Sequence, residues 1–238
     1  MMTKEKFDFE HVAFFGRSIE EYVEMFDLEL DDLKGKRLLD CSAGPAAFAC
    51  QAANLGIEVV AVDPMYGATA EELRRVVDHD TEVVKLKSND NRNLLYDEVV
   101  APDERRKAME IFLTDFNTGK ASHRYVEGCL PNLPFPDATF DMALSSNFLF
   151  LYSDIASSGM LTTSKFDYEF HLKSIMELLR IARKELRIYP LRAPGAPEHA
   201  YLPKIMGALK EQGYLVVLQP VTQRDIKGAE EMLRIIRM

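Results

Sequence analysis

Residues 36–64 limit the possible folds more than any other part of this sequence. They begin with a short apolar run, residues 37–39, which ends in Asp40 and is followed by a turn of small residues, Ser42-Ala43-Gly44. Pro45 comes next, where proline favours the start of a helix because its missing N–H costs no helical hydrogen bond. These features predict a strand, a tight turn and a helix that begins at Pro45.

The same stretch ends in a second strand. Gly56 stands where glycine commonly ends a helix, and the apolar run 58–62 then leads to Asp63. An acid at this strand end, 19 residues after Gly44, is placed to accept hydrogen bonds from two ribose hydroxyls. The unit therefore predicts a nucleoside ligand, although the same turn also occurs as a purely structural connection in α/β domains.

The turn lacks the glycines that a dinucleotide would need. The pattern G-x-G-x-x-G lets a pyrophosphate approach the backbone, whereas Ser42 and Ala46 stand here where glycines would be expected. Asp40 lies at the mouth of the turn, where its charge would repel a pyrophosphate. A carboxylate there suits a ligand with an ammonium or sulfonium group. S-adenosylmethionine is therefore favoured over a nicotinamide cofactor.

The composition fits one α/β domain. The chain has 238 residues, 47% of them hydrophobic, which is enough to bury a sizeable core. Its net charge of −9 argues against nucleic acid as a partner, because nucleic-acid-binding proteins carry a basic patch. Cys41, Cys50 and Cys129 form no C-x-x-C pair and indicate free thiols in a reducing compartment. With no long apolar run and no signal peptide, we expect a cytoplasmic protein without membrane association.

A helical leader, residues 1–34, precedes the first strand. Ser18 and Glu21 form a capping box, and apolar residues follow at helical spacing. We expect this helix to pack on the sheet or over its ligand edge. Arg17 and Tyr22 could reach a cofactor carboxylate, but we favour the simpler interpretation of a solvated arginine and a tyrosine at the rim of the core.

Residues 66–122 indicate a helical insertion. A crossover between parallel strands needs only about a dozen residues, so the excess predicts a cap with helices at 69–77 and 101–119 and a hydrophilic loop at 88–93. Such caps shape substrate pockets or act as lids, and a purely structural or dimerisation role is equally open. We expect the leader and the cap to belong to a single domain, residues 1–238.

Five further strands complete the predicted sheet. They are expected at 125–127, 140–144, 185–189, 214–219 and 232–236, with helices at 166–184 and 205–212. Ser145, Ser146 and Asn147 follow the strand at 140–144, at the end where open α/β sheets bind ligands. The proline-rich loop at 128–137 has apolar residues suited to a flat ring. The short link before the last strand favours an antiparallel ending.

The order of these motifs resembles the class I S-adenosylmethionine-dependent methyltransferase family, over about 36–65 and 123–219. L-L-D-C-S-A-G-P-A resembles its glycine-rich first motif, V-V-A-V-D-P its second, and L-P-F-P-D-A-T-F-D-M-A-L-S-S-N the stretch into its fourth strand. The resemblance implies a Rossmann-like three-layer sandwich with a seven-stranded, mostly parallel sheet and an antiparallel last strand. It also implies S-adenosylmethionine as the cofactor.

The resemblance assigns roles to residues. Asp40 would face the methionine ammonium, Asp63 the ribose, and Pro64 and Met65 the adenine. The other expected cofactor-binding residues are Ser42, Ala43, Gly44, Gly128, Cys129, Leu130, Ser145, Ser146 and Asn147. The family often has Gly-Asp where this chain has Gly128-Cys129, and a thiol is a weaker partner for the adenine amino group, a role that Glu127 could take instead.

No catalytic residue is assigned, because methyl transfer from a sulfonium needs mainly positioning and desolvation. Asn147, Tyr152, His171 and His199 are candidates near the site, and Asn147 is preferred. The histidine spacing favours no metal site. We expect methyl transfer to a small molecule chosen by the cap and the loop at 190–203. A non-catalytic cofactor-binding or interaction protein and a nicotinamide oxidoreductase are the alternatives.

Overall fold

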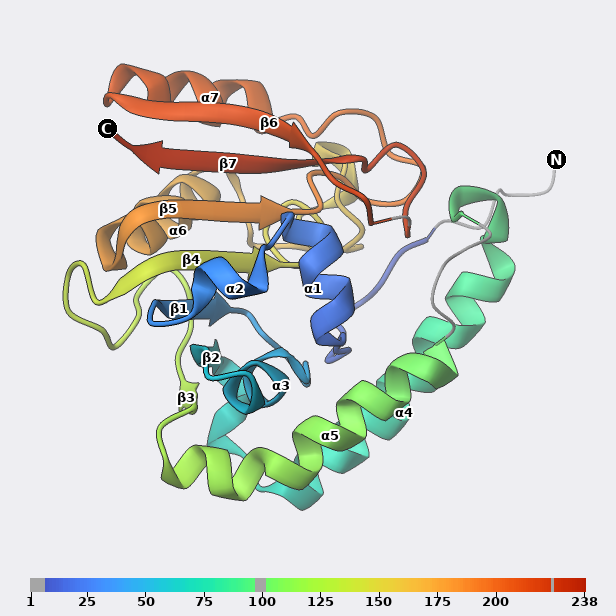
Figure 1. Cartoon of the computed structure of the whole chain (residues 1–238). Coiled ribbons are helices and arrows are strands. Elements are labelled where there is room, and N and C mark those ends of the chain that lie inside the picture. The colour runs from blue at the N-terminus through green and yellow to red at the C-terminus, as the bar shows by residue number, and fades with distance from the viewer. Residues whose placement is uncertain (1–6, 97–101, 224) are drawn as a thin grey trace, which may run out of the picture.

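A seven-stranded sheet forms the centre of the molecule (Figure 1). The structure, a computed structural model, describes residues 7–96, 102–223 and 225–238. The strand order is β3-β2-β1-β4-β5-β7-β6. The strands are β1 (Arg37–Cys41), β2 (Glu58–Asp63), β3 (Tyr125–Glu127), β4 (Phe140–Ser146), β5 (Ala182–Tyr189), β6 (Tyr214–Pro220) and β7 (Glu231–Arg237). Strands β1 to β5 pair in parallel, and β7 lies antiparallel between β5 and β6. The predicted Rossmann-like α/β fold with an antiparallel last strand is confirmed.

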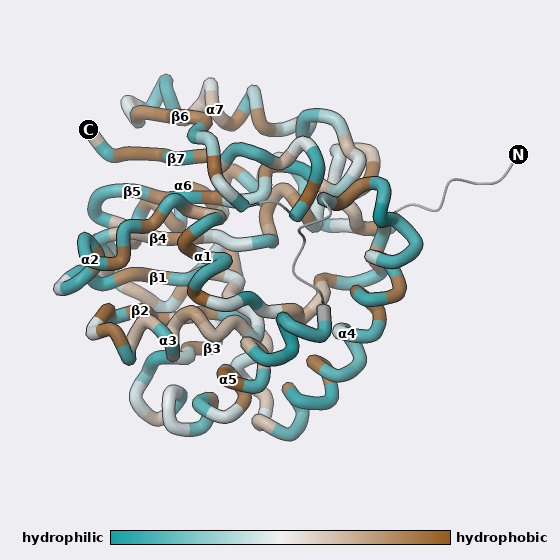
Figure 2. Tube along the Cα trace, turned by 45° about the vertical axis from the view of Figure 1, so that its right-hand side comes forward, coloured by the Kyte–Doolittle hydropathy of each residue, from teal (hydrophilic) through white to brown (hydrophobic). Residues whose placement is uncertain are grey.

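Alternation along the strands produces two cores, one on each face of the sheet. Leu38 and Leu144 belong to one hydrophobic cluster, whereas their neighbours Leu39 and Ala143 belong to the other, as expected when side chains alternate between faces. The first cluster is covered by α1 (Ile19–Phe26), α2 (Leu30–Leu33) and α3 (Phe48–Asn54), and the second by α6 (Tyr168–Ile181) and α7 (Leu202–Glu211). Three layers result, with hydrophobic residues concentrated along the strands (Figure 2).

Helix α3 begins later than predicted. The prediction of a start at Pro45 is wrong, because the chain is still in the turn there and the helix begins at Phe48. Ser42 and Gly44 adopt left-handed φ angles of 60° and 56°, and the Ala47 N–H is bonded to the Arg17 carbonyl. The end of the helix agrees with the prediction, since Gly56 follows it with a φ of 76°. Helix α1 begins with the predicted capping box at Ser18.

The insertion consists mainly of two long helices packed against each other, α4 (Ala70–Asp90) and α5 (Pro102–Ala121). The predicted end of the first helix at Val77 is wrong, and residues 88–90 of the predicted hydrophilic loop at 88–93 belong to α4. Ion pairs such as Arg74–Glu110 and Lys85–Asp103 join the two helices, so the polar residues mark an exposed helix face. Residue 101, the predicted start of the second helix, lies outside the described residues. Short 3₁₀ turns occur at η1 (Pro64–Gly67), η2 (Arg92–Leu94) and η3 (Ile155–Ser157).

Strand β5 is longer than predicted, and helix α6 is shorter. Residues 182–184 belong to the strand, because Ala182 pairs with Phe140 across an irregularity in the β4–β5 ladder.

None of the helices in the described part of the chain is long and apolar enough to cross a membrane. The division into a leader at 1–34, a cap at 66–122 and a single domain stays a prediction.

Candidate functional site

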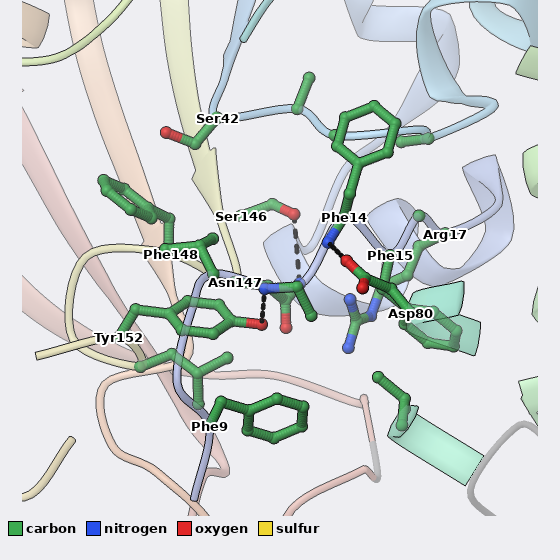
Figure 3. A pocket seen from close by; sticks show the side chains of 18 of the residues that line it. Phe9, Phe14, Phe15, Arg17, Ser42, Asp80, Ser146, Asn147, Phe148 and Tyr152 are labelled. Carbon is green, nitrogen blue, oxygen red and sulfur yellow. Dashed lines mark hydrogen bonds between the residues drawn. The ribbon is translucent and has the colours of Figure 1, made fainter. Parts of the chain in front are cut away.

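A cavity of about 460 Å³ opens at the carboxyl ends of β1, β2 and β4 (Figure 3). Most of its wall comes from the turn after β1 together with η1, the N-terminal residues 7–17, and residues 146–170. Helix α4, residues 129–130 and residues 225–226 also contribute. Cavities that hold small molecules in proteins usually measure about 300–1,000 Å³. The volume therefore suits a cofactor, a small substrate or parts of both.

Residues 7–17, here called the strap, cross this cavity before α1 begins. Three of its backbone N–H groups are bonded to distant segments: Phe9 to the Met160 carbonyl at 2.7 Å, Ala13 to the Tyr152 hydroxyl at 3.2 Å, and Phe14 to the Asp80 carboxylate at 2.7 Å. Gly16 touches the turn so closely that an added Cβ would lie 2.1 Å from the Pro45 carbonyl oxygen. The strap is thus fixed against the turn, the cap and the segment after β4.

The backbone amides of the turn are already bonded within the protein. The Gly44 N–H donates to Asp63 at 3.0 Å, and the Ala43 N–H donates to the Val62 carbonyl at 3.1 Å. The Tyr66 hydroxyl donates to the Gly44 carbonyl at 2.6 Å. A dinucleotide fold offers such amides to a pyrophosphate. This turn has the shape for close approach of a ligand but does not present those amides to a phosphate.

Two buried acids lie beside the turn. Asp40 accepts a hydrogen bond from the Tyr22 hydroxyl at 2.9 Å, and its Oδ1 has no partner among the described residues. Burial, together with the nearby Asp63 carboxylate, raises the pKa of Asp40 to about 7, against the opposing effect of the Tyr22 hydrogen bond. Burial also raises the pKa of Asp63 to about 6, against the opposing effect of the Met65 and Gly44 amides. Neither carboxylate has a Lys or Arg partner in the described part of the chain, so this wall favours a positively charged ligand.

Most of the predicted cofactor-binding residues line the cavity. They are Ser42, Ala43, Gly44, Asp63, Pro64, Met65, Cys129, Leu130, Ser146 and Asn147. Asp40 and Ser145 are fully buried beneath the wall, and Gly128 packs against Val62, where an added Cβ would lie 2.7 Å from that side chain. Glu127 is exposed and does not line the cavity. That these residues bind a cofactor stays a prediction.

The histidine candidates lie away from the cavity lining. His171 and His199 are fully buried, and burial lowers the pKa of both, that of His199 to about 3. The Nδ1 of His199 accepts the Tyr201 N–H, so its Nε2 carries the proton and donates to Ser153. It therefore cannot act as a base toward that serine. Asn147 and Tyr152, by contrast, line the cavity.

The favoured interpretation of Arg17 and Tyr22 is wrong. Tyr22 is fully buried on Asp40, and the Arg17 side chain, only 11% exposed, forms an ion pair with Asp225 at 3.4 Å. Arg17 thereby joins a buried ion group that the sequence analysis missed. Arg105 is its centre, because its guanidinium contacts both Glu21 and Asp225.

The members of this ion group are far apart in the sequence, so no local pattern could have predicted them. Arg17 comes from the strap, Glu21 from α1, Arg105 from α5 and Asp225 from the segment after β6. The strap did carry a signal: four phenylalanines within residues 7–15 are too many for a solvated leader. That concentration of aromatic residues indicates a buried segment.

Comparisons with known proteins gave an uncharacterised relative in sequence and a set of similar solved structures. No family model matches it. An uncharacterised protein of Methanocaldococcus jannaschii is 29% identical over 228 residues, which are 93% of this chain and 95% of that protein. Among solved structures, the chain is similar to a SAM-dependent methyltransferase from Aquifex aeolicus, with 15% identity, a TM-score of 0.41, and coverage of 92% of this chain and 95% of the other.

Two further solved structures are similar at the same level. Magnesium protoporphyrin IX methyltransferase from Synechocystis, with bound SAM, is 13% identical with a TM-score of 0.43, covering 87% of this chain and 73% of the other. A TehB-like SAM-dependent methyltransferase from Corynebacterium glutamicum is 12% identical with a TM-score of 0.41, covering 87% and 84%. TM-scores below 0.5 are too low to transfer a ligand or an activity, so the fold rests on the strand order of the sheet itself.

Proposed function

We propose that this protein is an S-adenosylmethionine-dependent methyltransferase whose acceptor is a small, largely apolar molecule. The observation that carries the proposal is the pair of buried acids, Asp40 and Asp63, beside a left-handed turn whose amides are already bonded. S-adenosylmethionine brings an ammonium and a sulfonium, and it has no phosphate. Asp40 is fully buried with an unpartnered Oδ1, so its charge lies behind the turn, where it favours a cationic group in the cavity.

The same turn argues against a nicotinamide cofactor. A pyrophosphate needs free amides and a positive environment, whereas Ala43 and Gly44 donate their N–H groups to Val62 and Asp63. Helix α3 starts only at Phe48, beyond the turn. The two buried carboxyl groups, when ionised, would repel the phosphates further.

The opposite wall of the cavity supports an apolar acceptor. Aromatic rings from the strap and from residues 146–170 gather there, among them Phe9, Phe148 and Tyr152 (Figure 3). Phe166 and Phe170 also line the cavity. The rings contact one another, with centroids 5.2 Å apart for Phe148 and Phe166 and 6.4 Å apart for Phe9 and Tyr152. Such a lining selects ligands by shape and apolar contact.

The strap supports a small acceptor. It crosses the cavity and is bonded at Phe9, Ala13 and Phe14, so a residue of a large polymer would have to displace it to enter. A free small molecule needs only the volume already present. When bound, S-adenosylmethionine supplies the electrophilic methyl group, and the protein supplies position and exclusion of water.

Asn147 stands where the two walls meet. Its N–H donates to the Tyr189 carbonyl at 2.7 Å, its φ is 53°, and its side-chain amide donates to the Ser146 hydroxyl at 3.1 Å. These bonds hold the side chain at the end of β4 beside both the turn and the aromatic segment. We assign it a positioning role for the reacting groups, and its test is a change in acceptor KM or kcat in Asn147→Ala with cofactor affinity retained.

A non-catalytic cofactor-binding protein is the second candidate. Cys129 favours it, because this exposed thiol stands where the family often has an acid for the adenine amino group. Such a protein would bind S-adenosylmethionine but would form no S-adenosylhomocysteine with any acceptor. Formation of S-adenosylhomocysteine in the presence of small aromatic acceptors separates the two.

Calorimetric titration tests the cofactor assignment. We expect S-adenosylmethionine and S-adenosylhomocysteine to bind with one site per chain, and NAD not to bind. Asp63→Asn should weaken both nucleosides. Asp141→Asn is the matched control, because Asp141 also accepts a backbone N–H, from Arg37 at 3.0 Å, but does not line the cavity. Equal affinities in the two variants, or no binding by the folded protein, would overturn the assignment.

A further inference from the structure

The strap and helix α4 together present three metal-ligating groups: His11 on the strap, and His79 and Asp80 on α4. Oδ1 of Asp80 lies 2.8 Å from Nδ1 of His79 and 3.3 Å from Nε2 of His11, and the three ligand atoms lie within 4.8 Å of one another. Tetrahedral zinc with bonds of about 2.0–2.1 Å separates its ligand atoms by about 3.4 Å. We propose that these three residues bind one divalent transition-metal ion.

The burial of Asp80 supports a cation at this place. The residue is only 2% exposed, and its ion-pair partners in the described part of the chain are His11 and His79. Neutral imidazoles do not balance a buried carboxylate, whose charge needs a cation nearby. A metal ion bound by all three side chains supplies that charge and keeps both imidazoles neutral.

The carboxylate of Asp80 is also held in orientation. Its Oδ2 accepts the Phe14 N–H at 2.7 Å, which leaves Oδ1 directed toward the two histidines (Figure 3 shows the bond to Phe14). Metal-ligating carboxylates are commonly fixed by such an additional hydrogen bond. The strap therefore contributes twice: His11 as a ligand and Phe14 as the support of another ligand.

Imidazole and carboxylate ligands select the metal class. Two nitrogens and one oxygen suit Zn²⁺, Co²⁺ or Ni²⁺, whereas Mg²⁺ and Ca²⁺ prefer oxygen ligands throughout. The His11 and His79 side chains are 54% and 66% exposed, so an ion can enter from solvent. Three protein ligands leave a position open, as in catalytic zinc sites, and His11 and Asp80 both line the cavity.

The metal would act on the cavity in two ways. Because its ligands come from the strap and from α4, it would hold the strap against the cap and stabilise the folded protein by an amount that rises with the logarithm of the metal concentration. Its open position would be available to an oxygen or nitrogen atom of a molecule in the cavity. This site does not depend on the methyltransferase proposal, since the metal itself is measured.

Calorimetric titration of metal-free protein with Zn²⁺ and with Co²⁺ tests the site, with the visible spectrum of Co²⁺ reporting its ligands. We expect one ion per chain and an increase in Tm. His11→Asn and His79→Asn should each weaken binding by at least about tenfold and remove the increase in Tm. Both residues are exposed, so neither substitution should impair folding.

His123→Asn is the matched control. His123 is exposed at the end of the cap, outside the cluster, and its φ of 60° is one that asparagine tolerates. The control should bind metal as the unmodified protein does. No one-to-one binding, or equal binding in all the variants, would overturn the proposal and leave the two histidines as hydrogen-bond partners of Asp80 only.

Discussion

The two walls of the cavity are made of different kinds of group. The wall beside the sheet consists of backbone and buried acids, with Asp63 holding the Gly44 amide and Tyr22 holding Asp40. The wall formed by the strap and its neighbours consists of side chains, chiefly aromatic rings and the ion group around Arg105. The wall beside the sheet suits a ligand recognised by fixed polar and charged groups. The wall formed by the strap suits a ligand recognised by its shape and apolar surface. With the proposed cofactor on the first wall and the proposed acceptor on the second, residues close together in the chain would recognise the cofactor and residues far apart would recognise the acceptor.

The ion group on the strap side should show the largest effect on stability. Replacing Arg105 by Met leaves the buried Glu21 and Asp225 to share the longer ion pairs to Arg17, which should lower the free energy of unfolding by about 3–5 kcal/mol. Arg75→Met, on the exposed face of α4, should change it by less than about 0.5 kcal/mol. Urea unfolding measures both, and similar losses in the two variants would mean that the group contributes no special stability.

The contact between the two walls comes next. Gly16→Ala places a Cβ against the Pro45 carbonyl and should destabilise the protein by about 2–3 kcal/mol, because backbone on both sides must shift. Gly207→Ala is the opposite case, since Gly207 lies in α7 with nothing within 4 Å of an added Cβ. It should stabilise by about 0.5–1 kcal/mol. A stabilising Gly16→Ala would show that the strap does not rest on the turn.

Within the wall beside the sheet, a charged hydrogen bond should outweigh a neutral one. Tyr22→Phe removes the donor to Asp40 and should reduce the free energy of unfolding by about 1.5–3 kcal/mol at pH 8, where Asp40 is ionised. Tyr189→Phe removes a bond to the Ala229 carbonyl at 3.0 Å and should reduce it by about 1 kcal/mol. The opposite order in thermal or urea unfolding would contradict a charged Asp40.

The acids should make the wall beside the sheet respond to pH. Because the folded pKa of Asp40 is about 7 and that of Asp63 about 6, both above the usual 3.8, the unliganded folded state binds more protons than the unfolded state between pH 4 and 7. Its free energy of unfolding should therefore fall as pH rises through that window. Affinity for the cationic S-adenosylmethionine should rise over the same range, by about tenfold between pH 5.5 and 8.

Asp40→Asn is the variant that checks this dependence. It should reduce the pH dependence of both profiles to the part that Asp63 contributes, whereas Asp141→Asn, at the other end of the sheet, should leave them unchanged. Stability curves at several pH values and calorimetric affinities give the two readouts. An affinity that does not change with pH in the unmodified protein would contradict ionisable acids at the ligand.

The difference between the walls also explains how far the sequence could predict the molecule. The sheet, its antiparallel ending and the residues beside the turn follow from local patterns, such as the apolar run before Asp40 and the glycine at the end of α3. The length of α4 could not be predicted from local patterns. Its polar residues form ion pairs with α5, and in the sequence alone such residues resemble a loop. Charge pattern cannot distinguish an exposed helix face from a loop without its partner.

The wall formed by the strap and its neighbours was the part that the sequence predicted least well. Phe14 bonds to Asp80 across 66 positions, and Arg105 meets Asp225 across 120. No spacing rule connects such residues, since only the folded chain brings them together. The abundance of phenylalanine in residues 7–15 predicts burial of that segment, but it does not indicate what the segment covers.

A crystal structure of the protein with S-adenosylhomocysteine tests the central claim most directly, namely that the cavity between turn and strap holds the cofactor. We predict the ribose hydroxyls within hydrogen-bonding distance of Asp63, the ammonium facing the turn beside Asp40, and the aromatic half of the cavity still free for an acceptor. A ligand bound elsewhere on the molecule, or none at saturating concentration with the strap and turn intact, would contradict the account.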